Sequence, residues 1–192
     1  SRPLDVYRFL RREIGSTYIQ FIPIVEIRGF ENMAPGTWDE AKLPMLGDPR
    51  CHPDHPESVV TPWSVAAEEY GYFLSKIWDE WQARDVGKVL VNLCETLVAQ
   101  HMRLPSQVCV HGEICGKGVA LEHDGDVYSC DHYVYPEYRL GNIRQQSLGD
   151  MVFSPRQVKF GYAKSETLPA YCRQCEFLSD CWGECPKNRL LR

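Results

Sequence analysis

The chain lacks the features that define several protein classes. It contains no run of eighteen or more apolar residues, so the sequence predicts no membrane-spanning helix. Its first fifteen residues, SRPLDVYRFLRREIG, are charged and lack the apolar stretch of a secretory signal. The formal net charge of -5 gives no general basic surface for nucleic acid. We therefore expect a cytoplasmic protein with neither a membrane nor a nucleic acid as partner, and the sequence predicts no oligomeric state.

Cysteine is the residue that the chain has in excess. There are nine cysteines among 192 residues, and seven of them fall in two groups. The odd number, the grouping and the lack of a secretory signal weigh against disulfides, which require an oxidising compartment. The first group is Cys109, Cys115 and Cys130, and the second, within CRQCEFLSDCWGEC, is Cys172, Cys175, Cys181 and Cys185.

The spacing of these cysteines favours iron–sulfur clusters over zinc. Soft thiolates select zinc, copper(I) or iron–sulfur, and each tetrahedral zinc ion or cubane cluster takes four of them. Seven cysteines therefore supply one complete site and three quarters of a second. Zinc sites are usually built from close CxxC pairs, and only Cys172 and Cys175 have that spacing. Zinc remains the alternative.

The first thirty residues predict the end of an α/β unit. Apolar positions from Leu4 to Ile14 recur at roughly helical spacing, and Gly15 is a suitable helix stop. The next stretch, TYIQFIPIVEI, is rich in β-branched and aromatic residues, which is typical of a buried parallel strand. Because one strand cannot form a parallel sheet, we expect this chain to begin within a longer protein.

Residues 30–102 predict an irregular loop followed by two helices. The loop, 30–60, is rich in Pro, Gly and Asp. A helix is expected from Thr61, a good N-cap, with Pro62 at its first position. The stretch KVLVNLCETLVAQHM predicts a short strand and a second helix. The apolar stripe of the first helix is predicted to be core: Phe73, Leu74, Ile77, Trp78 and Trp81.

Two features of this region resemble functional sites but have simpler explanations. His52 and His55 flank Cys51 in CHPDHP, where a solvated Pro-rich loop is favoured over a zinc site. Cys94 lies in an apolar stretch and is expected to be a small buried hydrophobe. We assign no function to these residues.

The character of the sequence changes at Cys109. GVALEHDGDVYSCD predicts a β-hairpin with its turn at Asp124-Gly125, and LGDMVFSPRQVKFGYA predicts a short helix. After Thr167 there is little regular pattern, so the group that the thiols bind is expected to organise this segment. The predicted fold class is α+β, with domains at residues 1–108 and 109–192.

The two cysteine groups resemble a known family. CVHGEICGKGVALEHDGDVYSCD and CRQCEFLSDCWGEC match the pattern C-x9-15-G-x4-C followed by C-x2-C-x5-C-x3-C of the SPASM extension of radical S-adenosylmethionine enzymes. Cys109, the pair Cys130-Asp131 and YRLGNI resemble the anaerobic sulfatase-maturating enzymes in particular. YIQFIPIVE resembles the sixth strand of their partial (β/α)6 barrel, which implies that residues 1–108 are the last βα elements of such a barrel.

The resemblance implies two auxiliary [4Fe-4S] clusters. By position, Cys109, Cys115, Cys130 and Cys185 would hold the first cluster. Cys172, Cys175 and Cys181 would hold the second, with a later cysteine that this chain does not contain. The last four-cysteine motif would therefore be divided between the two clusters.

The resemblance also implies an activity. The family oxidises a Cys or Ser of a sulfatase polypeptide to formylglycine with S-adenosylmethionine, and Asp131 matches its proposed base. Val25 matches a residue against the adenine of S-adenosylmethionine, although barrel core is nearly as good an interpretation. The C-x3-C-x2-C loop that holds the radical-generating cluster is absent, so this chain is expected to be inactive alone. The alternatives are another SPASM peptide-modifying enzyme and a zinc-stabilised binding module.

Overall fold

The computed structural model of the chain describes residues 2–30 and 43–190. The chain divides into two units, one with Ser1–Arg28 and Gly47–Leu104, the other with Gly29–Leu46 and Pro105–Arg192. Residues 31–42 of the predicted loop lie outside the described residues. None of the described helices is long and apolar enough to cross a membrane. The α+β class is confirmed, and the domain limits at 1–108 and 109–192 stay a prediction.

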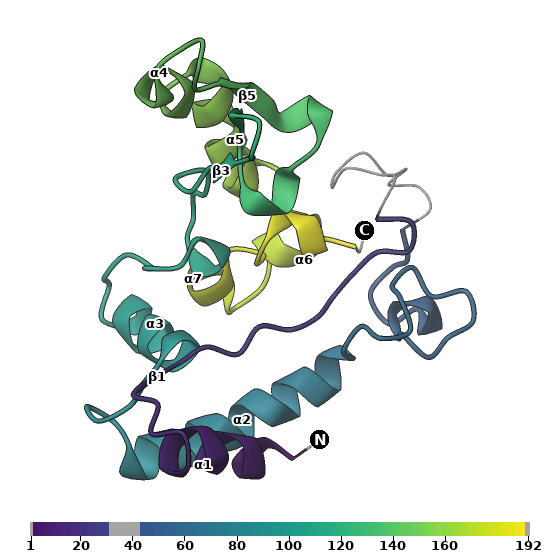
Figure 1. Ribbon diagram of the computed structural model, residues 1–192. Helices are drawn as coiled ribbons and strands as arrows, with labels where there is room; N and C mark the ends of the chain where they lie inside the picture. Colours follow the sequence, from purple (N-terminus) through teal and green to yellow (C-terminus); the bar gives the residue numbers. More distant parts are fainter. Residues whose placement is uncertain (1, 31–42, 191–192) are drawn as a thin grey trace. The chain divides into compact units, whose positions relative to one another are not determined.

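The first unit consists mainly of helices around a two-stranded parallel sheet (Figure 1). Its elements are α1 (Pro3–Arg12), β1 (Tyr18–Ile19), η2 (Pro49–Cys51), α2 (Ala67–Arg84), β2 (Leu90–Val91) and α3 (Asn92–His101). The predicted helix at Leu4–Ile14 is confirmed as α1, and Gly15 follows it with a φ of 74°. In β1 and β2, Tyr18 pairs with Leu90 and Ile19 with Val91.

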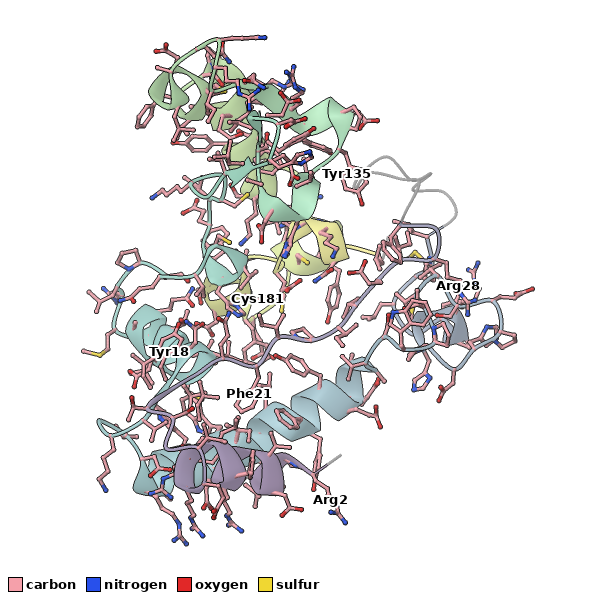
Figure 2. All side chains as sticks on the ribbon, viewed as in Figure 1. Arg2, Tyr18, Phe21, Arg28, Tyr135 and Cys181 are labelled. Atoms are coloured by element: carbon pink, nitrogen blue, oxygen red, sulfur yellow. The ribbon has the colours of Figure 1, made fainter. Side chains whose placement is uncertain are left out.

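The strand predicted over residues 17–27 is mostly wrong. Only Tyr18–Ile19 forms a strand, because β2 offers a ladder of the same two-residue length. Among the described residues beyond β1, residue Ile27 forms one isolated antiparallel β-bridge, with Val60. Phe21 packs edge-on against Phe73 of α2, with ring centroids 5.1 Å apart (Figure 2).

The predicted start of the next helix at Thr61 is also wrong, since α2 begins at Ala67. The Thr61 hydroxyl lies 2.9 Å from Ser64 Oγ. The Ser64 hydroxyl accepts a 3.0 Å hydrogen bond from the Glu26 backbone N–H. The contact with Ser64 occupies the Thr61 hydroxyl, and the long-range contacts with Glu26 hold residues 61–64 against the extended chain after β1. The described part of the loop before them, 43–60, is irregular apart from η2.

The core of the first unit confirms most of the predicted apolar stripe. Phe73 and Trp78 pack against a buried cluster formed by Tyr7, Ile19, Ile77, Trp81, Val89, Val91 and Cys94. Trp81 Nε1 donates a 2.8 Å hydrogen bond to the Val89 carbonyl. Burial raises the pKa of the Cys94 thiol to about 12, so this cysteine is a core residue, as expected.

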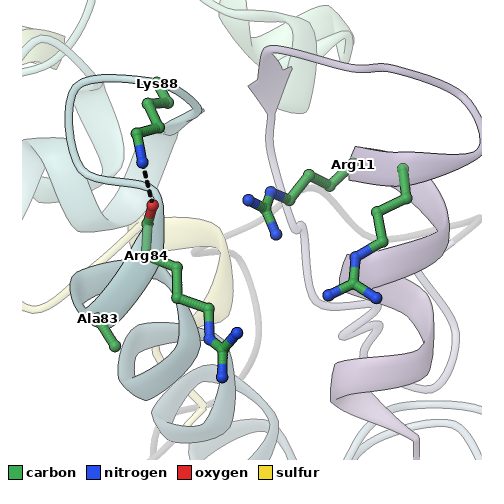
Figure 3. A pocket seen from close by; sticks show the side chains of 5 residues that line it. Arg11, Ala83, Arg84 and Lys88 are labelled. Atoms are coloured by element: carbon green, nitrogen blue, oxygen red, sulfur yellow. Dashed lines mark hydrogen bonds between the residues drawn. The ribbon is translucent and has the colours of Figure 1, made fainter.

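An open basic pocket lies between the carboxyl ends of α1 and α2 (Figure 3). It is lined by Arg11, Arg12, Ala83, Arg84 and Lys88. Lys88 Nζ donates to the Arg84 carbonyl at 3.0 Å, and Arg11 pairs with the buried Asp85 at 2.6 Å. Cations at helix carboxyl ends complement the helix dipoles, which accounts for this cluster.

The second unit has a three-stranded antiparallel sheet and short helices. Its elements are η3 (Cys109–His111), β3 (Ala120–Leu121), β4 (Asp126–Tyr128), η4 (Asp131–Tyr133), η5 (Pro136–Tyr138), β5 (Arg139–Asn142), α4 (Leu148–Val152), α5 (Pro155–Glu166), α6 (Ala170–Arg173), α7 (Leu178–Cys181) and η6 (Pro186–Asn188). After Thr167 the helices α6 and α7 have only four residues each, as the lack of pattern predicts.

The predicted hairpin is confirmed as β3 and β4. Leu121 pairs with Val127, and Gly125 has a φ of 92° in the turn. Asp124 accepts a 3.0 Å hydrogen bond from the Asp126 backbone, which closes this turn. Val127 is fully buried, so the hairpin joins the core of the unit on the strand that leads to Cys130.

Candidate metal centre

The candidate site is organised by α5. Ser154 caps this helix by accepting a 3.2 Å hydrogen bond from the Gln157 backbone, and Pro155 occupies the first helical position. Gln157, Gly161 and Lys164 are all buried within the helix. Their spacing of four and three residues places them on one helix face.

One side chain of this face connects two cysteine segments. Gln157 Nε2 donates to the Gly116 carbonyl at 2.8 Å and to the Ser129 carbonyl at 2.9 Å. Gly116 follows Cys115 and Ser129 precedes Cys130. The Gln157 amide therefore fixes the backbone beside two of the predicted ligands.

Gly161 allows the Cys115 segment to lie directly on the helix. The Cys115 backbone donates to the Gly161 carbonyl at 3.2 Å. A Cβ atom at residue 161 would lie 2.5 Å from the Cys115 carbonyl oxygen, closer than real Cβ contacts. The backbone can approach this closely only because residue 161 is glycine.

Lys164 holds the third cysteine segment. Its Nζ donates to the carbonyls of Cys109 at 2.5 Å and Val110 at 2.8 Å, although the residue is only 1% exposed. Burial lowers the pKa of this ammonium, while the Cys115 and Cys109 thiols raise it. None of these three α5 residues was predicted from the sequence. The pattern that could have indicated them is a helix next to a cysteine group with polar residues on its inner face.

The first thiol group comprises Cys109, Cys115, Cys130 and Cys185. Burial raises the pKa of Cys185 to about 11, and the Cys109 and Cys115 thiols add to the increase. Burial likewise raises the pKa of Cys130 to about 12, with a smaller contribution from Cys185. Three of these cysteines lie in segments that are hydrogen bonded to α5, and Cys185 Sγ lies 3.4 Å from Nδ1 of His132 in η4. All nine cysteines of the chain are free of disulfides, as expected.

The second thiol group comprises Cys172, Cys175 and Cys181. Burial raises the pKa of Cys172, and the Cys181 and Cys175 thiols raise it further. The fourth cysteine of this motif, Cys185, lies 3.4 Å from Nδ1 of His132. Assignment of each group to a cluster stays a prediction.

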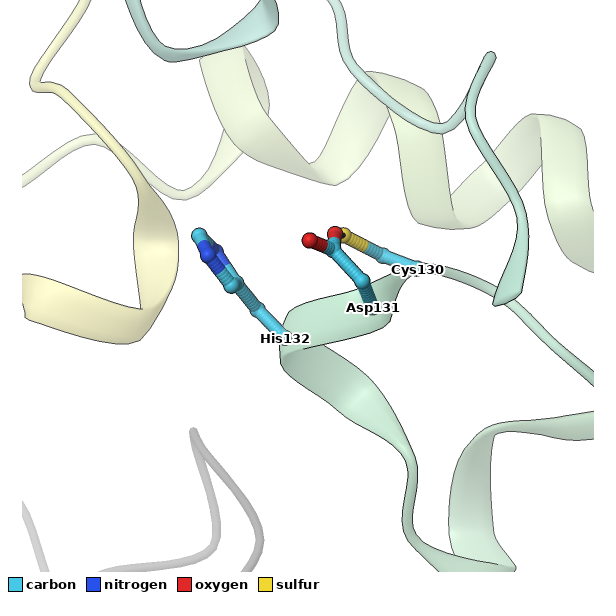
Figure 4. Close-up of side chains that lie close together, drawn as sticks. All are labelled: Cys130, Asp131 and His132. Atoms are coloured by element: carbon cyan, nitrogen blue, oxygen red, sulfur yellow. Dashed lines mark hydrogen bonds between the residues drawn. The ribbon is translucent and has the colours of Figure 1, made fainter. Parts of the chain in front are cut away.

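Asp131 and His132 lie close to Cys130 (Figure 4). Cys130 Sγ donates to Asp131 Oδ1 at 3.0 Å, and this contact lowers the pKa of Asp131. His132 Nδ1 lies 3.4 Å from Cys185 Sγ. The Cys130 sulfur, a carboxylate oxygen of Asp131 and a ring nitrogen of His132 all lie within 4.8 Å of one another. An exposed carboxylate and an imidazole thus border the thiols.

The donor set suits an iron–sulfur cluster. Contacts with α5 hold the segments of three free cysteines, Cys109, Cys115 and Cys130, and the buried Lys164 donates to the Cys109 carbonyl. Thiols must lose their protons to bind iron, and the cationic iron then relieves the mutual repulsion of the thiolates. The residues present therefore fit a cluster of four thiolate ligands.

The other predicted or considered residues lie in the first unit. Val25 is half-buried in the extended chain after β1. His52 and His55 accept hydrogen bonds at Nδ1 from the backbones of Asp54 and Glu57, at 3.3 and 3.2 Å. These contacts give both histidines a role in loop turns.

Comparison with known proteins is consistent with this donor set. Residues 109–176 match the SPASM family model, described as an iron-sulfur cluster-binding domain. A serine-type anaerobic sulfatase-maturating enzyme of Bacteroides thetaiotaomicron is 42% identical over 190 residues, which are 99% of this chain and 43% of that protein. A cysteine-type enzyme of Clostridium novyi is 26% identical over 196 residues, 98% of this chain and 44% of that protein.

The same relationship is visible in the fold. The solved structure titled "Native anSMEcpe with bound AdoMet" matches with a TM-score of 0.71 at 20% identity, over 98% of this chain and 45% of that chain. The chain thus spans less than half the length of these proteins. It is a homologue of the anaerobic sulfatase-maturating enzymes over that part, and it contains a SPASM domain at residues 109–176.

Proposed function

We propose that this chain is part of a cytoplasmic radical S-adenosylmethionine enzyme that oxidises a residue of a sulfatase polypeptide to formylglycine. The observation that carries the proposal is that α5 holds the segments of Cys109, Cys115 and Cys130, with Asp131 in contact with Cys130 and His132 in contact with Cys185. The complete protein would supply the C-x3-C-x2-C loop and the other strands of a partial (β/α)6 barrel, of which residues 1–108 form the last elements.

The chain would hold two auxiliary [4Fe-4S] clusters. The first would be held by Cys109, Cys115, Cys130 and Cys185. The second would be held by Cys172, Cys175 and Cys181, with one ligand from outside this chain. The contacts of α5 with the segments of Cys109, Cys115 and Cys130, and of His132 with Cys185, support this division.

Asp131 would act as the base. Bound S-adenosylmethionine supplies the radical chemistry that removes a hydrogen atom from the substrate Cβ. A carboxylate oxygen of Asp131 would then accept the proton that the substrate loses, which requires hydrogen-bond reach. The exposed position of Asp131 leaves its carboxylate accessible to a peptide. Val25 would contact the adenine.

The substrate residue would be serine. The chain is 42% and 37% identical to two serine-type enzymes but only 26% identical to a cysteine-type enzyme. A structure with a bound Cys peptide shares the fold at 21% identity, which supports a peptide substrate without selecting its reacting residue.

A zinc-stabilised binding module is the second candidate. It is favoured by the mixed sulfur and nitrogen donors of Cys130, Cys185 and His132, since structural zinc accepts both. In that case the protein would have no redox role.

Metal analysis of the complete protein, purified under strict anaerobic conditions, separates these candidates. The proposal expects iron, acid-labile sulfide and visible absorbance, together with formylglycine formation on a serine-containing sulfatase peptide, measured by mass spectrometry. Colourless protein with stoichiometric zinc and no modified peptide would replace the proposal with the binding module.

A further inference from the structure

The three residues between Cys181 and Cys185 have an unusual backbone. Trp182, Gly183 and Glu184 all have positive φ angles, of 49°, 68° and 54°. Positive φ is uncommon for non-glycine residues, and three in succession need support from the surroundings. This left-handed loop separates the second thiol group from the one cysteine of the motif that joins the first group.

Arg189 provides that support. Its Nη2 donates to the Trp182 carbonyl and its Nε to the Gly183 carbonyl, both at 3.1 Å. Its Nη1 donates to Thr167 Oγ1 at 3.3 Å, and Thr167 is the C-cap residue of α5. One planar guanidinium thus connects the left-handed loop to the helix that organises the first thiol group.

The charge of Arg189 lies beside cysteines of both thiol groups. Its guanidinium is hydrogen bonded to the carbonyls of residues 182 and 183, which stand between Cys181 of the second group and Cys185 of the first. Among the described residues its hydrogen-bond partners are three uncharged oxygens, which do not neutralise its positive charge. Arg189 is half-buried, so solvent screens this charge only in part.

We propose that Arg189 is a positioning residue that divides the last cysteine motif between two clusters and makes both clusters easier to reduce. This inference rests on the proposed function. A reduced cluster carries one more negative charge than an oxidised one, so a fixed cation nearby stabilises the reduced state and raises the reduction potential.

The test replaces the cation in the complete protein with reconstituted clusters. Arg189→Met removes the charge and the guanidinium donors, and Lys159→Met removes one charge from the exposed face of α5 as a matched control. Iron content and the reduction potential of each auxiliary cluster are measured, the latter by titration followed with electron paramagnetic resonance. In Arg189→Met we expect the reduction potentials of both clusters to fall by about 59 mV. This shift corresponds to a roughly tenfold change in the equilibrium constant of a one-electron reduction. Lys159→Met should match the wild type.

The outcomes distinguish failure of the proposed function from failure of the role of Arg189. Wild-type protein without iron would remove the proposed function itself. Fully loaded Arg189→Met with an unchanged potential at either cluster would overturn only the role of Arg189. If Arg189→Met cannot hold iron, Arg189→Lys is expected to recover iron and Arg189→Gln is not, and equal behaviour of these two variants overturns the role.

Discussion

Gln157 and Ser129 are joined by a 2.9 Å hydrogen bond from the side-chain amide of one to the backbone carbonyl of the other. They are 28 residues apart in sequence, and they are only 2% and 1% exposed. The same amide nitrogen also donates to the carbonyl of Gly116. A single helix side chain therefore sets the distance between the Cys115 and Cys130 segments.

Gln157→Leu should destabilise the second unit and reduce its iron content. The variant removes the Gln157 donor from the buried Ser129 carbonyl and the partly buried Gly116 carbonyl, which costs about 1–3 kcal/mol of unfolding free energy. Urea denaturation measures the loss, and iron analysis after anaerobic reconstitution measures cluster occupancy. Gln145→Leu is the control, because residue 145 is exposed. Wild-type iron and stability in Gln157→Leu would contradict the role of α5.

Gly183→Ala should disrupt the division of the last cysteine motif. Residue 183 has a φ of 68°, and an added Cβ would lie 2.6 Å from Leu168 Cδ2 and 3.1 Å from Arg189 Nη2. The strain should displace the loop that separates Cys181 from Cys185, so the reconstituted protein should hold less iron than the wild type.

The control for this variant is Gly118→Ala. Residue 118 lies in the same unit, and a Cβ there would meet nothing within 4 Å. Iron content in Gly118→Ala should equal that of the wild type. Equal iron in both alanine variants would show that the left-handed loop tolerates a side chain.

Short-range patterns were predictable from the sequence. The hairpin follows from the Asp124-Gly125 turn, where local hydrogen bonding and positive φ fix the geometry. The cysteine groups follow from spacing, because thiols near one another in sequence have few other uses. Helix α1 follows from its apolar period and from Gly15.

Features that depend on long-range contacts were not predictable. Thr61 has a side chain that is typical of an N-cap, but its hydroxyl contacts the Ser64 hydroxyl. The Ser64 hydroxyl in turn accepts a hydrogen bond from the Glu26 backbone. The strand after Thr17 stops at Ile19 because its pairing partner is short. The polar α5 residues have no periodic signal for a metal site, since their partners are 28–55 residues away in the sequence.

The ion pair of Arg8 with Glu80 should make the first unit sensitive to acid. Arg8 donates from Nε and Nη2 to the two carboxylate oxygens, both at 3.1 Å, and this fork lowers the pKa of Glu80. A group with a lowered folded-state pKa stabilises the fold above its unfolded pKa, and this stabilisation is lost as pH falls through the folded pKa.

Glu80→Gln should therefore cost about 1–2 kcal/mol of unfolding free energy at about pH 7, and almost nothing at about pH 2. Urea denaturation at both pH values measures the difference from the wild type. Asp79→Asn on the same helix is the control, because its carboxylate is 64% exposed and lies 3.8 Å from Lys76, against 9% exposure for Glu80. If the difference in unfolding free energy between Glu80→Gln and the wild type is the same at both pH values, the ion pair is not its cause.

Asp131→Asn should abolish formylglycine formation in the complete protein while leaving iron content unchanged. The amide has nearly the shape of the carboxylate but cannot accept the substrate proton, and loss of a general base costs about 10²–10⁴-fold in rate. Mass spectrometry of a sulfatase peptide measures the product. Glu113→Gln removes another exposed carboxylate, between Cys109 and Cys115, and should retain activity. If Asp131→Asn keeps its rate with full iron, the base is another residue; if it loses iron, Asp131 acts through its contact with Cys130 rather than on the substrate.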